Sequence, residues 1–202
     1  MPTIAIVNYG VGNLRSVKRG LEQSGATATI TDKSIDITRS DAIILPGVGA
    51  FKAALKSLRK LAKPIVSQVD AGRPVLGICL GYQILFTRSH EGGVRRGLNL
   101  FQGEVTKLSG NVKLPHIGWN TVSISRTDQL VDGVNDGAYM YFVHSYAPKP
   151  LEKNIIIAYT NYGETFPSIV SQRNIFATQF HPEKSGSDGL RILKNFVAIT
   201  KR

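Results

Sequence analysis

The chain has 202 residues, of which 42% are hydrophobic and 19% are charged. This length suits one domain with a single sizeable core, and the composition excludes a disordered chain. The longest mostly apolar stretch, residues 74–86, is too short to form a transmembrane helix. The first residues have no basic segment ahead of their apolar run, unlike a signal peptide. We therefore expect one domain, residues 1–202, in the cytoplasm.

The net charge of +11 would suit a nucleic-acid-binding protein. The basic residues are spread along the whole chain, however, and the densest group, residues 56–60, fits the solvent-facing side of a helix. A basic surface, or one that faces an acidic partner subunit, is therefore favoured over nucleic-acid binding. The single cysteine excludes an internal disulfide, and four scattered histidines make a zinc site unexpected.

The first half of the chain alternates apolar segments with helical patterns. Apolar or β-branched runs at residues 3–7, 27–31, 41–45 and 74–78 predict strands. Between them, Leu14, Val17 and Leu21 repeat at helical spacing, and further helical patterns cover residues 51–61 and 65–69. Apolar strands that alternate with helices indicate a parallel sheet covered on both faces.

The second half of the chain is rich in closely spaced strand patterns. They cover residues 121–125, 139–143, 155–160, 168–172 and 175–180, and Arg173-Asn174 predicts a two-residue hairpin turn. A last helix has Leu190, Leu193, Phe196 and Val197 on one face, with Ser187 as its N-cap. The predicted fold is an α/β open sandwich. Its central, mostly parallel sheet is flanked by helices, with antiparallel strands in the C-terminal half.

The segment Gly77-Ile-Cys-Leu-Gly81 places the cysteine between a predicted strand and a predicted helix. A nucleophile at such a turn adopts a strained backbone conformation, and the flanking glycines prevent clashes. A helix N-terminus favours the thiolate, and the amide of Leu80 would point toward a developing oxyanion. The alternative is a small buried cysteine at a helix start. The two glycines favour Cys79 as a nucleophile.

A thiol nucleophile needs a base and a group that orients the base. Among the histidines, His90 and His116 lie in predicted loops, whereas His144 and His181 each end a predicted strand. Only His181 is followed, after one proline, by a carboxylate, Glu183. On an extended chain such a pair projects to one side, and proline stiffens it. We therefore predict His181 as the base and Glu183 as its orienting partner.

Three motifs together resemble the class I, or triad-type, glutamine amidotransferases: Leu45-Pro-Gly-Val-Gly49, the run from Gly77 to Gln83, and Phe180-His-Pro-Glu183. The resemblance implies that the loop of Gly47, Val48 and Gly49 supplies a second oxyanion amide. It also implies that Gln83 helps to hold a glutamine substrate and that Glu91 binds its α-amino group. Without the resemblance, Gln83 would be a polar residue on a helix face and Glu91 a solvated loop charge.

Within that family, residues 8–14, 97–100, 115–120 and 141–146 are similar to the glutaminase subunit of imidazole glycerol phosphate synthase in histidine biosynthesis. The chain has Asn8 where that group usually has aspartate. The similarity implies that Ser145 and Tyr146 line the substrate pocket through their backbone. It also implies that five residues lie near a partner subunit: Asn13, Trp119, Asn120, Tyr141 and Lys184. Trp119 could instead be a core aromatic residue.

The resemblance implies hydrolysis of L-glutamine and transfer of ammonia to a synthase/cyclase subunit, expected to be a (β/α)8 barrel in a heterodimer. It implies no cofactor, no metal, no nucleic acid and no membrane. Two alternatives stay open. One is a glutaminase of another class I amidotransferase, serving pyridoxal phosphate, anthranilate or GMP synthesis. The other is a non-catalytic interaction module on the same fold, which an assay of glutamine hydrolysis would distinguish.

Overall fold

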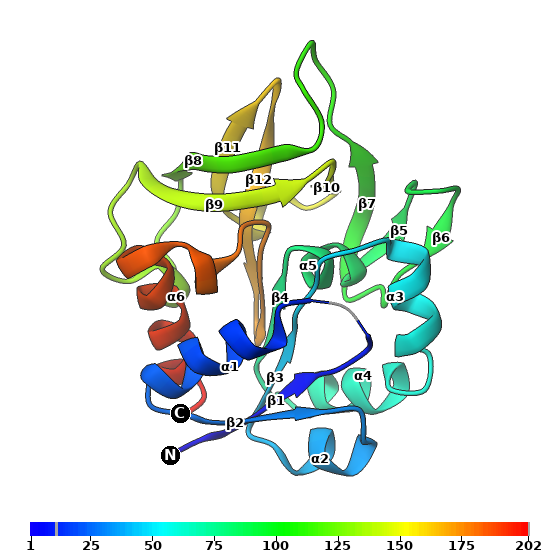
Figure 1. Cartoon of the computed structure of the whole chain (residues 1–202), viewed down its shortest axis with the longest axis vertical. Helices are drawn as coiled ribbons and strands as arrows, with labels where there is room; N and C mark the ends of the chain where they lie inside the picture. The colour runs from blue at the N-terminus through cyan, green and yellow to red at the C-terminus, as the bar shows by residue number, and fades with distance from the viewer. Residues whose placement is uncertain (11, 202) are drawn as a thin grey trace.

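The computed structural model describes residues 1–10 and 12–201, so Val11 and Arg202 lie outside the described residues. Its main feature is a nine-stranded sheet (Figure 1). The order across the sheet is β2 (Thr27–Thr31), β1 (Thr3–Val7), β3 (Ala42–Leu45), β4 (Val75–Ile78), β13 (Ile175–Thr178), β12 (Glu164–Gln172), β11 (Ile156–Tyr162), β8 (His116–Ile124) and β9 (Ala138–His144). Pairing is parallel from β2 to β13 and antiparallel from β13 to β9. The predicted α/β fold is confirmed.

A second, four-stranded sheet was not predicted from the sequence. Its order is β10 (Tyr146–Pro150), β7 (Phe101–Lys107), β5 (Phe86–Ser89) and β6 (Arg95–Arg96). Strand β10 follows β9 after a single residue, Ser145. The chain therefore passes from one sheet to the other at residues 144–146.

Helices cover both faces of the parallel strands (Figure 1). Helices α1 (Leu14–Gln23) and α6 (Gly186–Ile199) lie on one face, and α3 (Phe51–Leu58) and α4 (Ala62–Asp70) lie on the other. Alternation along β1 divides the core accordingly, since Ile4 and Ile6 pack with α1 and α6 while Ala5 and Val7 pack on the opposite face. The remaining helical elements are α2 (Ser34–Arg39), α5 (Leu80–Ile84), η1 (Gln129–Val131), η2 (Lys153–Ile155) and η3 (Pro182–Lys184). No helix in the described ranges is long and apolar enough to cross a membrane.

Several predicted boundaries are confirmed and others are wrong. Strands β1 and β2 have the predicted limits, and Gln172 pairs with Ile175 across the predicted two-residue turn. The helix predicted for residues 51–61 ends at Leu58. Ser187 is not an N-cap, because α6 begins at Gly186 and Ser185 precedes it, with its hydroxyl donating to the carbonyl of His181.

The prediction that His116 lies in a loop is wrong, because His116 begins β8, which also contains Trp119. Proline and glycine, here Pro115 and Gly118, are typical of loops. Gly118 has φ +132° yet remains paired with Phe142 of β9. Cross-strand pairing therefore overrides the local preference of these residues for irregular structure.

The two glycines that flank Cys79 are required by close packing of the backbone. A Cβ atom at Gly81 would lie 1.8 Å from the carbonyl oxygen of Leu45. A Cβ atom at Gly77 would lie 2.9 Å from the carbonyl group of Gly81. The turn between β4 and α5 can therefore form only where both positions lack a side chain, as the sequence pattern predicted.

We expect Gly81→Ala to lower the free energy of unfolding by about 3 kcal/mol, because the methyl group must displace the backbone at Leu45. Gly137→Ala is the control. Gly137 has φ +78° with no atom within 4 Å of its virtual Cβ, so that variant should lose only about 1 kcal/mol through backbone strain. Urea unfolding curves measure both. Equal losses would show that the Leu45 contact does not constrain position 81.

Candidate active site

The predicted site residues meet at one edge of the parallel strands. Cys79 follows β4, the loop 46–49 follows β3, and residues 179–181 follow β13. Carboxyl ends of parallel strands share one edge of a sheet, and ligands bind there in open α/β folds. Segments that are far apart in the sequence therefore converge on Cys79.

Cys79 has the strained backbone predicted for a nucleophile. Its φ and ψ are 53° and −104°, and only 4% of the residue is exposed. A non-glycine residue with positive φ is uncommon and marks strain that the surrounding structure imposes. Its Sγ lies 3.6 Å from the carbonyl oxygen of Val143 and 3.7 Å from Nε2 of Gln179. No sequence pattern points to Gln179, although it lies in the same segment as His181.

His181 and Glu183 form the predicted pair, in a different local conformation. Nδ1 of His181 lies 2.8 Å from Oε1 of Glu183, and both side chains are almost fully buried. The expected extended geometry is wrong, because Pro182–Lys184 forms the 3-10 turn η3. The pair is anchored to β9, since the His181 amide donates to the Tyr141 carbonyl at 2.9 Å. Ser185 reinforces this anchor by accepting from the Tyr141 amide and donating to the His181 carbonyl.

The environment of His181 favours its protonated form. Burial lowers the pKa of His181, but its interactions with Cys79 and Glu183 raise the pKa more, to about 10. Nε2 of His181 is buried without a hydrogen-bond partner among the described residues. One ring nitrogen is thus held by Glu183, and the other remains able to exchange a proton with a reacting group.

The predicted oxyanion amides do not both face the site in this conformation. The amide of Leu80 donates to the carbonyl oxygen of Gly47 at 3.3 Å. Because the N–H of Val48 belongs to the same peptide as that carbonyl, it points the opposite way. The hydroxyl of Tyr9, a residue to which no sequence pattern points, donates to the adjacent Pro46 carbonyl. Burial and the charge of Cys79 raise the pKa of Tyr9, so its hydroxyl stays protonated.

A pocket of about 180 Å³ adjoins Cys79 and brings all four predicted substrate-binding residues together. Its lining is Val48, Gly49, Cys79, Leu80, Gln83, Glu91, Pro115, Val143, His144, Ser145 and Tyr146. Burial raises the pKa of the Glu91 carboxyl, and a hydrogen bond with the backbone of Phe51 partly offsets this. The pocket therefore combines a nucleophile, a carboxylate and several backbone groups.

The predicted interface residues fall into separate groups. Trp119 is 55% exposed and packs edge-to-face on Tyr141, and the amine of Lys184 lies 5.5 Å from the Tyr141 ring centre. Asn120 lies on the opposite face of β8, where its side chain donates to the Asn161 carbonyl. Asn13 precedes α1 and accepts a hydrogen bond from the Ser16 amide.

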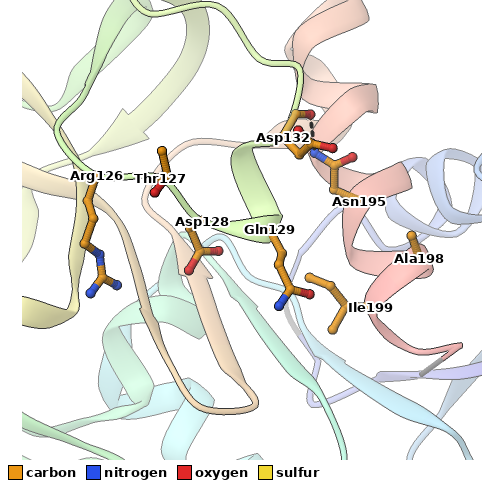
Figure 2. Close-up of a pocket in the computed structure, with 8 residues that line it drawn as sticks. All are labelled: Arg126, Thr127, Asp128, Gln129, Asp132, Asn195, Ala198 and Ile199. Carbon is orange, nitrogen blue, oxygen red and sulfur yellow. Dashed lines mark hydrogen bonds between the residues drawn. The ribbon is translucent and has the colours of Figure 1, made fainter.

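Another hollow, of about 640 Å³, lies between η1 and α6 (Figure 2). Asn195 there donates to the carbonyls of Leu130 and Asp132, which ties the two helical elements together. Its lining contains neither cysteine nor histidine. Over residues 1–10 and 12–201, no group of three or more His, Cys, Asp or Glu side chains could hold a metal ion. The Cys79 pocket is therefore the candidate active site.

Comparison with known proteins identifies the family of the chain. The sequence profile of the family described as Glutamine amidotransferase class-I matches residues 5–199. The chain belongs to this family. It is 48% identical to "Imidazole glycerol phosphate synthase subunit HisH" of Archaeoglobus fulgidus, over 98% of this chain and 100% of that protein. Identity to the subunit of the same name from Geobacter metallireducens is 45%, with 100% of each chain covered.

Two solved structures share the fold. A putative GMP synthase subunit from Thermoplasma acidophilum has a TM-score of 0.77 at 23% identity, covering 100% of this chain and 94% of that one. PurLQS from Thermotoga maritima has a TM-score of 0.78 at 19% identity, covering 98% of each chain. At such identities the likeness concerns the fold alone.

We expect His181 to remain an imidazolium at pH 8, because its raised pKa places deprotonation near pH 10. Cys79→Ser removes the interaction of His181 with the thiol, so the pKa of His181 should fall in this variant. The measurement is a 15N NMR titration of the histidine side chains. His116, whose pKa burial lowers to about 4, is the internal control and should be neutral throughout. Deprotonation of His181 near pH 6.5 in both proteins would contradict this account.

Proposed function

We propose that this chain is the glutaminase subunit of an imidazole glycerol phosphate synthase and acts in histidine biosynthesis. It hydrolyses L-glutamine to glutamate and ammonia, with Cys79, His181 and Glu183 as the catalytic triad. The observation that carries the proposal is the strained Cys79 beside the buried His181–Glu183 pair, in a chain that matches the named relatives over its whole length. An intact triad argues against a non-catalytic interaction module.

The chemistry follows from the positions of these groups. The Cys79 thiolate attacks the side-chain amide carbon of glutamine, and His181 protonates the departing ammonia. Glu183 holds the imidazole by Nδ1 and stabilises its charge. Water then hydrolyses the glutamyl thioester, which returns the thiol and releases glutamate. Gln83, Glu91, Ser145 and Tyr146 hold the substrate, with the Glu91 carboxylate paired to its α-ammonium group.

The ammonia passes to a synthase subunit, which we propose is a (β/α)8 barrel that forms a heterodimer with this chain. The outer face of the β8–β9 ribbon suits docking. Ile117, Trp119 and Tyr139 are 60%, 55% and 62% exposed on that face, where Tyr141 also lies. Aromatic anchors of this kind dominate protein interfaces. Lys184, whose amine lies 5.5 Å from the Tyr141 ring centre, belongs to the same proposed contact region, and Asn13 is a further proposed contact. Asn120 lies on the inner face of the ribbon and is not part of this docking face.

Docking would also govern the oxyanion site. Turning the peptide between Gly47 and Val48 would release the Leu80 amide and aim the Val48 amide at the oxyanion. Glycine at positions 47 and 49 makes this rotation inexpensive. A Cβ atom at Gly12 would lie 3.3 Å from Cα of Gly47. The loop that contains Gly12 and Asn13, here called the Asn13 loop, therefore packs directly on this peptide. A partner that displaces the Asn13 loop can therefore change the orientation of the peptide.

We expect Cys79→Ala to abolish glutamine-dependent synthesis by the complex while leaving ammonium-dependent synthesis by the partner intact, because only the nucleophile is lost. Steady-state assays with glutamine and with ammonium chloride measure the two activities. Retention of glutaminase activity by Cys79→Ala would refute the nucleophile assignment.

We expect the isolated chain to hydrolyse glutamine about 10²–10³-fold more slowly than the complex, mainly through kcat, because one oxyanion donor is worth about that factor. Trp119→Ala should reduce this activation and leave alkylation of Cys79 by iodoacetamide unchanged. Ile35→Ala is the control, because Ile35 is 49% exposed in α2, away from the β8–β9 ribbon. An isolated chain as fast as the complex would rule out gating by the partner.

A further inference from the structure

Two buried histidines face each other on the inner side of the β8–β9 ribbon. His116 and His144 are direct cross-strand partners, and Nδ1 of His116 lies 3.1 Å from Nε2 of His144. The ring of His116 is stacked between Phe142 and Tyr162, at centroid distances of 4.9 Å and 3.9 Å. Nδ1 of His144 lies 2.9 Å from the carbonyl oxygen of Tyr146, in the wall of the Cys79 pocket. Packing therefore holds both rings in one orientation.

The partners at one end of this pair determine where its protons lie. Oδ1 of Asn120 accepts from the amide of Thr121 at 2.8 Å, and Nδ2 donates to the Asn161 carbonyl at 2.9 Å. These contacts settle which atom of the Asn120 side chain is nitrogen. That nitrogen is 3.3 Å from Nε2 of His116 and can only donate. Neutral His116 must then carry its proton on Nδ1.

The contact of His144 at the other end of the pair requires the same donor-to-acceptor direction of the hydrogen bonds. The Tyr146 carbonyl can only accept, so His144 carries its proton on Nδ1 and accepts from His116 through Nε2. Burial lowers the pKa of His116 to about 4. Burial is also the largest of the effects that together lower the pKa of His144 to about 3. Both rings are therefore neutral near pH 7. The hydrogen bonds run from Asn120 through both rings to Tyr146.

The series continues from the Tyr146 carbonyl to the nucleophile. This oxygen also accepts from Nε2 of Gln83 at 2.8 Å. The same nitrogen donates to Oε1 of Gln179 at 3.3 Å, and Nε2 of Gln179 donates to Sγ of Cys79 at 3.7 Å. Gln179 is fully buried. If its amide were reversed, its oxygen would face the thiolate and its nitrogen would face another donor on Gln83.

We propose that His116 and His144 are positioning residues for Cys79: through the Tyr146 carbonyl they hold Gln83, and through Gln83 they hold the Gln179 amide whose N–H binds the nucleophilic sulfur. The inference rests on the proposed function, since it concerns the same nucleophile. Loss of the His144 donor leaves the Tyr146 peptide with one restraint fewer. Gln83 then holds Gln179 less firmly, and the sulfur loses part of the hydrogen bond that stabilises its charged form.

The first test reads the proton positions directly in the wild-type chain. Long-range 1H–15N NMR at pH 7 should show both His116 and His144 protonated on Nδ1 and unprotonated on Nε2. The exposed His90 serves as a reference. A proton on Nε2 of either ring would overturn the proposal. This measurement needs neither glutamine nor a partner, and it does not depend on whether any variant folds.

The second test uses a matched pair of substitutions at His144. The amide nitrogen of His144→Asn can occupy the place of Nδ1 and keep the donation to Tyr146, whereas His144→Gln replaces Nε2 and loses it. We expect iodoacetamide to alkylate Cys79 about five- to tenfold more slowly in His144→Gln, about the worth of one neutral hydrogen bond. The rate in His144→Asn should stay within about twofold of wild type. kcat for glutamine in the complex should follow the same order.

Thermal unfolding of both variants separates positioning from general stability. Equal alkylation rates in the two variants, or rates that follow only their melting temperatures, would overturn the proposal. Failure of the proposed function has a different signature: the wild-type complex would lack glutaminase activity while both histidines keep the Nδ1 proton and the alkylation rates still differ. Failure of the inference alone would leave glutaminase activity normal in His144→Gln.

Discussion

The contact between the backbone of Gly81 and the carbonyl of Leu45 is the constraint on which the site depends. It is closer than any side chain permits, since a Cβ atom at Gly81 would lie 1.8 Å from that oxygen. It joins the end of β3 to the turn that carries Cys79. The loop 46–49 consequently lies against this turn, and the Leu80 amide reaches the Gly47 carbonyl. One packing requirement thus supports Cys79, the proposed nucleophile, and also brings the proposed oxyanion peptide to it.

The antiparallel half of the large sheet completes the site through its backbone. Strand β9 binds the amide of His181 through the Tyr141 carbonyl, and its Val143 carbonyl lies against the sulfur of Cys79. Tyr141 and Val143 direct their side chains to the outer face of the ribbon, where Trp119 is exposed. On the proposed function, the strand that offers a docking face to a partner therefore also holds the proposed base, His181, and touches the proposed nucleophile, Cys79.

Sequence patterns predicted the parts of the site whose requirements are local. The glycines around Cys79 and the spacing of His181 and Glu183 each satisfy a constraint within a few residues, and the family resemblance supplied Gln83 and Glu91. The contacts of Tyr9, His116 and Gln179 could not be predicted, because each joins segments that are distant in the sequence and paired only in the folded sheets. The first part of β8, residues 116–120, was missed for the same reason: its pairing with β9 outweighs the loop preference of Gly118.

The free energy gained by burying Trp119 on docking is similar in size to the contribution of one oxyanion donor to the reaction barrier. Covering the exposed part of Trp119 would release about 2–3 kcal/mol, and one oxyanion donor is worth about 2.7–4 kcal/mol in the barrier. Docking shifts the equilibrium between the two orientations of the peptide only by the difference in the partner's affinity for them. On the proposed function, contact with Trp119 on the β8–β9 ribbon supplies affinity. The proposed switch is the loop at Gly12, which packs beside Cα and N of Gly47. On the proposed function, therefore, the β8–β9 ribbon anchors the partner and the Asn13 loop switches the oxyanion peptide.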